Sequence, residues 1–133
     1  MFLGGQFESE FPHDLLIINI NKTYNNGKRK NKNKDSIYDR QNIYEATRGW
    51  WRLDISRANN IDYVLTEYKG VIRVIFKPQR WLQNIERDSR WGFEGDEVRR
   101  KEIINLYMNK EVPKKKGMAN PIRYFSKSID AII

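Results

Sequence analysis

The hydrophobic positions of this chain fall into short runs separated by polar turns. Leu15–Ile20 is an almost continuous apolar run rich in β-branched residues, which predicts a buried strand. Two further runs, Tyr63–Tyr68 and Val71–Phe76, are separated only by Lys69 and Gly70. Two β-rich runs joined by two residues, the second a glycine, predict a β-hairpin.

Alternation along the Val71–Phe76 run predicts which side chains face the core. Ile72, Val74 and Phe76 share one face of a regular strand, and we expect that face to be buried. Arg73 belongs to the opposite face, which we expect to be partly solvated. Pro78 is expected to end this strand because proline cannot donate a ladder hydrogen bond.

Two segments carry helical spacing instead. Asp39–Arg48 places Ile43, Ala46 and Thr47 on one face, and Gly49 is a natural stop. Val98–Tyr107 repeats the helical spacing. Short strands are expected at Trp50–Leu53, at Arg90–Gly95, where glycine ends the strand, and at Pro121–Phe125, with a turn or single helical turn at Ser56–Asn60.

This layout predicts one α+β domain over residues 1–133. A length of 133 residues suits a single core, and 39% hydrophobic residues are enough to build it. Short strands with two short helices favour a small curled, mostly antiparallel sheet or barrel.

The composition excludes several classes of site. Cysteine is absent, so disulfides, thiolate metal sites and cysteine nucleophiles are ruled out, and a cytoplasmic location is favoured. His13 is the one histidine, which leaves no histidine pair for a zinc site. No apolar run approaches the roughly 20 residues of a membrane span, and no signal segment is visible. We therefore assign no catalytic residue, metal site, cofactor or membrane contact.

The net charge of +8 points to polyanionic partners. Much of it lies in a predicted flexible loop at 21–35 that contains Lys28, Arg29 and Lys30. A second basic run, Lys114, Lys115 and Lys116, lies in another predicted loop. Both runs are candidates for contacts to phosphate, and solvated loops without a role are the alternative.

The densest candidate constellation is Thr47, Arg48, Trp50 and Trp51. Arginine offers a planar charged fork for phosphate or a base edge, and tryptophan offers a flat face for stacking a base. Neighbours in a strand point to opposite faces, so the two tryptophans cannot both be core. The alternative is that one tryptophan is core and Arg48 caps the helix end.

Asn120 and Arg123 form a second candidate pair, separated by Pro121 and Ile122. Asparagine can contact adenine through two hydrogen bonds, and arginine can hold a phosphate. A plain turn followed by an exposed arginine is the alternative. We include both residues in the predicted ligand site.

The segment from Tyr44 to Trp81 resembles a module of bacterial and phage proteins. The resemblance is carried by Y-E-A-T-R-G-W-W-R-L, by Y-V-L-T-E-Y-K-G-V-I-R-V-I-F-K, and by the later R-W-G-F-E-G and N-P-I-R-Y-F. That module occurs alone or beside nuclease domains, including those of the GIY-YIG type. This chain has no G-I-Y and Y-I-G pair, so the resemblance implies no nuclease activity here.

The architecture also resembles the PUA-like group, which includes YTH, EVE and ASCH domains. The resemblance rests on short strands around a curled sheet, with a helix that delivers aromatic and basic residues. It implies a pocket for one unpaired base, including a modified one, stacked on aromatic rings.

Together these features favour a nucleic-acid or nucleotide binding module over a self-sufficient enzyme. Two alternatives stay open. One is a phage-type inhibitor or adaptor that binds a host protein. The other is a Mg²⁺-dependent nuclease that uses Glu67, Glu94 or Asp96.

Overall fold

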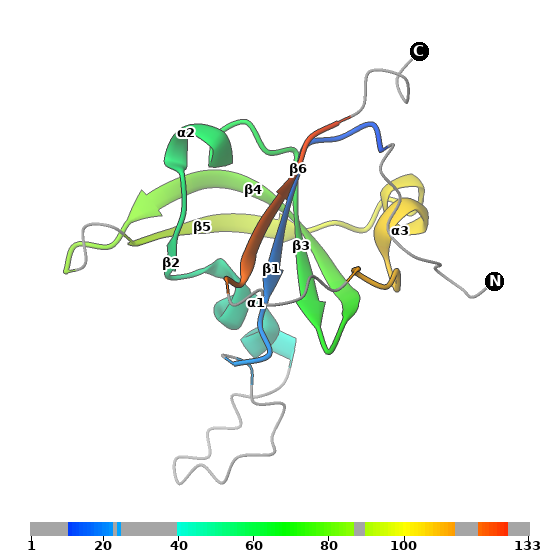
Figure 1. Ribbon diagram of the computed structural model, residues 1–133, viewed down its shortest axis with the longest axis horizontal. Helices are drawn as coiled ribbons and strands as arrows, with labels where there is room; N and C mark the ends of the chain where they lie inside the picture. The colour runs from blue at the N-terminus through cyan, green and yellow to red at the C-terminus, as the bar shows by residue number, and fades with distance from the viewer. Residues whose placement is uncertain (1–10, 23, 25–39, 87–89, 114–119, 128–133) are drawn as a thin grey trace, which may run out of the picture.

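A six-stranded mixed sheet organises the protein in the computed structural model, which describes residues 11–22, 24, 40–86, 90–113 and 120–127. The strands are β1 (Leu15–Asn19), β2 (Trp51–Arg52), β3 (Tyr63–Tyr68), β4 (Val71–Gln83), β5 (Arg90–Glu97) and β6 (Ile122–Phe125), and the helices are α1 (Arg40–Arg48), α2 (Ile55–Ala58) and α3 (Lys101–Tyr107). Figure 1 shows α1 below the sheet, α3 to its right and α2 at the upper left.

The strand order is β2-β5-β4-β3-β1-β6, and every pair is antiparallel except β1 with β3. The sheet curls until its two edges approach each other. The hydroxyl of Tyr124 on β6 accepts from the backbone N–H of Asp54, and the Arg57 guanidinium lies 4.4 Å from the Tyr124 ring. The predicted α+β domain with a curled, mostly antiparallel sheet is therefore confirmed. Within the described residues, α2 adds a third helix to the two expected.

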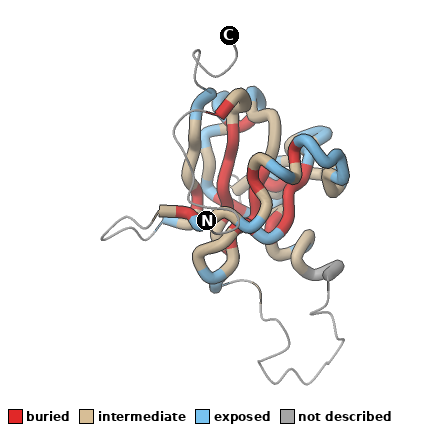
Figure 2. Tube along the Cα trace, turned by 90° about the vertical axis from the view of Figure 1, so that its right-hand side faces the viewer, coloured by how far each residue is buried: buried red, intermediate tan, exposed pale blue. Residues whose placement is uncertain are grey.

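Both faces of the central strands are buried, and Figure 2 shows this as red running along the tube. The barrel cluster lies inside the curl and consists of Leu16, Ile18, Ile20, Trp51, Val64, Val74, Phe76, Phe93 and Ile122. The α3 cluster lies on the other face and consists of Phe11, Leu15, Ile17, Leu65, Ile72, Ile75, Ile103, Tyr107 and Val112. The continuous apolar sequence of β1 follows from this, because strands covered on both faces lose the polar alternation.

The hairpin between β3 and β4 turns at Lys69 and Gly70, as predicted. Their φ angles are +53° and +83°, and two consecutive positive values are what a type I′ hairpin turn requires. Glycine adopts this conformation without steric cost, which explains its place at the second position.

Four details of β4, β5 and α3 differ from the sequence-based expectation. A register shift pairs Thr66 with Val74 and then Glu67 with Ile72, so β4 carries a bulge there. The bulge moves Ile72 into the α3 cluster with Ile75, while Val74 and Phe76 stay in the barrel cluster. The prediction that Ile72, Val74 and Phe76 share one face was therefore wrong.

Pro78 does not end β4, and Gly95 does not end β5. The two residues pair with each other, and a second register shift follows at Pro78 and Arg80. The residue left out of the ladder is Gln79, next to the proline. Bulges are among the few positions in a sheet that tolerate proline, and β4 continues to Gln83. Helix α3 begins at Lys101 rather than Val98, because Val98 still donates a backbone hydrogen bond to Ile75 of β4.

Candidate functional site

The C-terminal end of α1 is fixed to the sheet by side chains of the interior. Thr47 is fully buried, and its hydroxyl donates to the Ile43 carbonyl at 2.7 Å and lies 2.9 Å from the Thr66 hydroxyl. Trp51 is 6% exposed, and its indole N–H donates to the Thr47 carbonyl at 2.7 Å. Thr47 and Trp51 therefore hold α1 against β3, and neither of these two predicted ligand residues offers its side chain to solvent.

Trp50 lies on the opposite side of the chain and is 36% exposed. Its ring packs over Gly92 of β5, where an added Cβ would lie 3.0 Å from two ring carbons and 2.6 Å from the Arg48 carbonyl oxygen. Glycine at position 92 thus lets the ring lie close to the outer face of the strand. One tryptophan is buried and its neighbour is exposed, as expected, although the strand predicted at Trp50–Leu53 is limited to Trp51–Arg52.

Arg48 is held beside the Trp50 ring. Its Nε donates to the Phe93 carbonyl at 3.0 Å, and its guanidinium pairs with Glu45 at 3.8 Å. The same guanidinium lies 5.7 Å from the ring centres of both Tyr44 and Trp50. Arg48 therefore bridges α1 and β5, and the face of an aromatic ring is a favourable neighbour for its charge.

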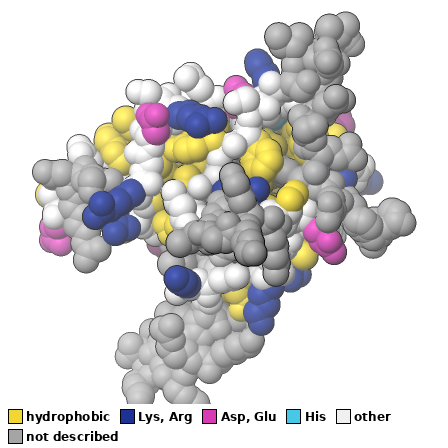
Figure 3. Space-filling view, in the orientation of Figure 1, with side chains coloured by type: hydrophobic (Ala, Val, Ile, Leu, Met, Phe, Trp, Pro, Cys, Tyr) yellow, Lys and Arg dark blue, Asp and Glu magenta, His cyan; other side chains and the backbone are white. Residues whose placement is uncertain are grey.

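Two further arginines flank Trp50. Arg52 on β2 is exposed and pairs in register with Arg90 on β5, whose guanidinium donates to the Trp50 carbonyl at 3.2 Å. We call Arg48, Trp50, Arg52 and Arg90 the Trp50 surface. In Figure 3, basic side chains gather at the end of the molecule where β2 lies beside the end of β4 and the start of β5.

Glu94, on the same face of β5, is neutralised locally by Arg80. The Arg80 Nε donates to the Glu94 carboxylate at 2.7 Å. This hydrogen bond lowers the pKa of Glu94, and the charges of Arg80 and Arg48 add to the effect. Because Arg80 neutralises Glu94, this carboxylate does not offset the charge of the Trp50 surface. Within that surface, Glu45 offsets part of the charge of Arg48.

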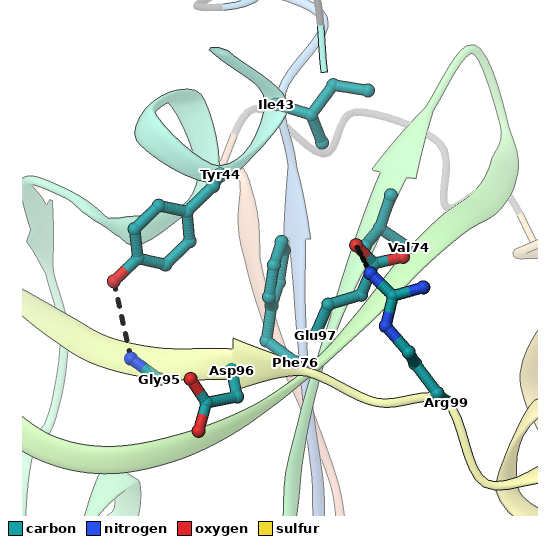
Figure 4. A pocket seen from close by; sticks show the side chains of 8 residues that line it. All are labelled: Ile43, Tyr44, Val74, Phe76, Gly95, Asp96, Glu97 and Arg99. Atoms are coloured by element: carbon teal, nitrogen blue, oxygen red, sulfur yellow. Dashed lines mark hydrogen bonds and ion pairs between the residues drawn. The ribbon is translucent and has the colours of Figure 1, made fainter. Parts of the chain in front are cut away.

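An open cavity of about 530 Å³ lies between α1 and the β4–β5 pair (Figure 4). It is lined by Ile43, Tyr44, Val74, Phe76, Gly95, Asp96, Glu97 and Arg99. The Tyr44 hydroxyl accepts from the backbone N–H of Gly95 at 3.3 Å, and the ring packs 5.4 Å from that of Phe76. Arg99 pairs with Glu97 at 3.7 Å, so aromatic walls meet a polar rim.

Asn120 and Arg123 are not brought to the Trp50 surface by any contact within the described residues. The Asn120 side chain accepts from the Ile122 N–H, closing a local turn. Arg123 donates to the Pro113 carbonyl at 2.7 Å and lies 5.3 Å from the Phe125 ring, which packs on the α3 cluster. Alternation in β6 points Arg123 away from Ile122 and Tyr124, which face the barrel cluster.

The six predicted phosphate contacts, Lys28, Arg29, Lys30, Lys114, Lys115 and Lys116, lie outside the described residues. The predicted loop at 21–35 also falls there, apart from residues 21, 22 and 24. Of the predicted ligand residues, Arg48 and Trp50 are thus the two that meet on one surface.

The ligand site predicted from the sequence did not include Gly92 or Arg90. The available signal was Arg90-Trp91-Gly92, because a glycine inside a strand often marks the close approach of another group. Nothing in the sequence identified that group as Trp50, which lies more than forty residues away in the chain.

Of the carboxylates considered for a nuclease, Glu67 lies on β3, whereas Glu94 and Asp96 both lie on β5. Glu67 is 8% exposed on β3, Glu94 is bonded to Arg80, and Asp96 accepts from Gln79 at 3.5 Å. Among the described residues, no three His, Cys, Asp or Glu side chains form a group able to hold a metal ion. In the same part of the chain, no helix is both long and apolar enough to cross a membrane.

Comparisons with known proteins found no significant match to a protein-family model, a curated protein or a solved structure.

Proposed function

We propose that the protein binds single-stranded nucleic acid, with one unpaired base stacked on Trp50 and the neighbouring phosphates on Arg48, Arg52 and Arg90. The observation that carries the proposal is the exposed Trp50 ring among three arginines. A cytoplasmic location and a PUA-like mode of base recognition, both suggested by the sequence, belong to the same proposal.

The position of the ring supports stacking. Trp50 lies over Gly92, so the backbone of β5 supports one side of it, and a third of its surface remains open. A supported aromatic face accepts any unpaired base, and each such stack contributes about 1–3 kcal/mol in known single-strand binders. Bases in a duplex are already stacked on both faces, so the site favours single strands.

The charges support the same ligand. Arg48 is only 18% exposed and is held by Phe93 and Glu45, so it is oriented before a ligand arrives. Arg52 is exposed, and Arg90 is tied to the Trp50 backbone. Arginine forks of this kind suit phosphate oxygens and give binding that weakens with salt.

The test is a pair of affinities measured by fluorescence anisotropy with labelled single-stranded and duplex oligonucleotides of one sequence. The wild-type protein should prefer the single strand. Trp50→Ala should weaken single-strand binding about 5- to 150-fold, the range expected for loss of one stack, and Trp50→Phe should restore part of it. Ile85→Ala is the control for loss of an exposed apolar side chain that is not aromatic, because Ile85 is 93% exposed.

Two results would overturn the proposal. If wild type and Trp50→Ala bind equally at every salt concentration, binding is due to surface charge alone and no base stacks on Trp50. Absence of binding to any oligonucleotide would favour the alternative of a protein partner.

A further inference from the structure

The cavity between α1 and the β4–β5 pair differs in charge from the rest of the protein. Asp96 and Glu97 contribute two carboxylates and Arg99 one guanidinium, whereas the chain as a whole has a net charge of +8. A phosphate is disfavoured beside two carboxylates. The cavity is therefore suited to a ligand that donates hydrogen bonds.

The walls of the cavity suit a flat ring. Tyr44 and Phe76 meet at an interplanar angle of 53° and form an aromatic corner. The volume of about 530 Å³ falls within the range of about 300–1,000 Å³ that is usual for small-ligand sites. In Figure 4, Glu97 and Arg99 lie at one end of the cavity, and the Tyr44 hydroxyl and Asp96 lie towards the other.

We infer that this cavity binds a guanine base of the strand held on the Trp50 surface; the inference rests on the proposed function. Guanine is the common base whose Watson–Crick edge carries two adjacent N–H donors, at N1 and N2. A carboxylate, which only accepts, can take both of these donors at once. Beside them lies the acceptor O6, for which Arg99 supplies N–H groups.

The other bases fit this polar rim less well. Adenine and cytosine place a ring nitrogen acceptor beside their amino group, and that acceptor faces a carboxylate unfavourably. Thymine and uracil have one N–H between two acceptors. Each correct bidentate contact discriminates against the wrong base by roughly 5- to 150-fold in known complexes.

Arg48 connects the cavity to the proposed nucleic-acid site. Its guanidinium lies 5.7 Å from the ring of Tyr44, which lines the cavity, and 5.7 Å from the ring of Trp50. The ring centres of Tyr44 and Trp50 therefore lie at most about 11 Å apart. In the proposed complex, a strand that stacks one base on Trp50 places a nearby base in the aromatic corner and keeps its phosphates outside on the arginines.

The experiment measures base preference in two ways. Short oligothymidylates with guanine, hypoxanthine, adenine or cytosine at one central position are compared by anisotropy, and free guanosine and adenosine are compared by calorimetry. We expect guanine to bind about 10-fold or more tightly than adenine or cytosine. Hypoxanthine lacks the 2-amino group and should fall between them.

Glu97→Gln and Asp96→Asn test the carboxylates while keeping side-chain size. At least one of them should reduce the guanine preference to within about 2-fold and leave binding of plain oligothymidylate unchanged. Glu102→Gln is the matched control, because Glu102 makes a similar exposed pair with Arg100, at 3.4 Å, on α3.

The outcomes separate this inference from the proposed function. Trp50-dependent binding with no base preference would overturn the inference alone. If no oligonucleotide binds, the proposed function fails. The titration with free guanosine then tests the cavity separately: if guanosine binds no more tightly than adenosine, the cavity is not a guanine site. Acetyl-arginine amide binding more tightly than guanosine would overturn it in favour of a peptide ligand.

Discussion

Trp50 and Trp51 are adjacent in the chain and lie in opposite environments. Trp51 is buried in the barrel cluster and donates to the Thr47 carbonyl, whereas Trp50 lies on the outer face of β5 over Gly92. The buried ring fixes the end of α1, and this fixed end presents the exposed ring and Arg48 beside it. The interior of the sheet therefore positions the surface on which we propose that a base stacks.

The largest expected effect distinguishes the two tryptophans by stability. Trp51→Ala should lower the free energy of unfolding by about 3–5 kcal/mol, because it empties a packed core position and removes a buried hydrogen bond. Trp50→Ala should cost less than about 1.5 kcal/mol, since that ring is partly exposed. Chemical denaturation of both variants measures this. Equal losses would contradict the assignment of one ring to the core and the other to the surface.

Gly92→Ala tests the support beneath Trp50. The added Cβ would lie 2.6 Å from a backbone oxygen and 3.0 Å from the Trp50 ring, so the backbone or the ring must move. We expect a loss of about 1–3 kcal/mol in stability and weaker binding of single strands. Gly49→Ala is the control, because its Cβ would meet nothing closer than 3.4 Å. Unchanged stability and affinity in Gly92→Ala would mean that the close packing of ring and strand is unimportant.

Arg52→Ala and Arg90→Ala isolate the contribution of charge. Each should reduce the slope of log affinity against log salt concentration by about 0.7, the value for one phosphate contact to a single strand. Arg73→Ala serves as the reference, because Arg73 is also exposed but lies on β4, where it donates to the Tyr68 carbonyl. If the slope of log affinity against log salt concentration is unchanged in Arg52→Ala and Arg90→Ala, these two arginines do not contact phosphates.

The smallest expected effect concerns His13, which lies in the region of the α3 cluster. Its Nδ1 lies 2.6 Å from the Tyr107 hydroxyl, and burial lowers its pKa below the usual 6.5, with smaller contributions from the charges around it. The unfolded chain therefore binds more protons near this pH, so stability should fall as the pH drops through 6.5.

Unfolding measured between about pH 7.5 and pH 5.5 checks this dependence, and His13→Gln should flatten it. Single-strand binding should stay constant over the upper part of the range, because arginine does not titrate there. A binding affinity that follows the protonation of His13 would show that the two regions are coupled, contrary to this account.

Much of the fold could be predicted because its signals are local. A few consecutive residues are enough to indicate the apolar strand β1 and the turn at Lys69 and Gly70. The face of Ile72 could not be predicted, because the bulge beside Arg73 depends on pairing with β3. The continuation of β4 past Pro78 likewise depends on β5.

The candidate site could be predicted only in part, because some of its features also depend on contacts between distant segments. Alternation required one of Trp50 and Trp51 to face outward, but the Thr47 carbonyl, supplied by the end of α1, determines which one is buried. Thr47 itself was expected to face a ligand, and its hydrogen bond to Thr66 places it in the interior. The cavity could not be foreseen, since its lining comes from α1, β4, β5 and the segment after β5.

The most direct test of the central claim is quenching of tryptophan fluorescence by oligothymidylate at about 0.2 M salt, where purely electrostatic binding is weakened. We expect saturable quenching in the wild-type protein and in Arg73→Ala, and its loss in Trp50→Ala. The same saturable quenching in Trp50→Ala would contradict the account, because the stacked base would then lie on another ring.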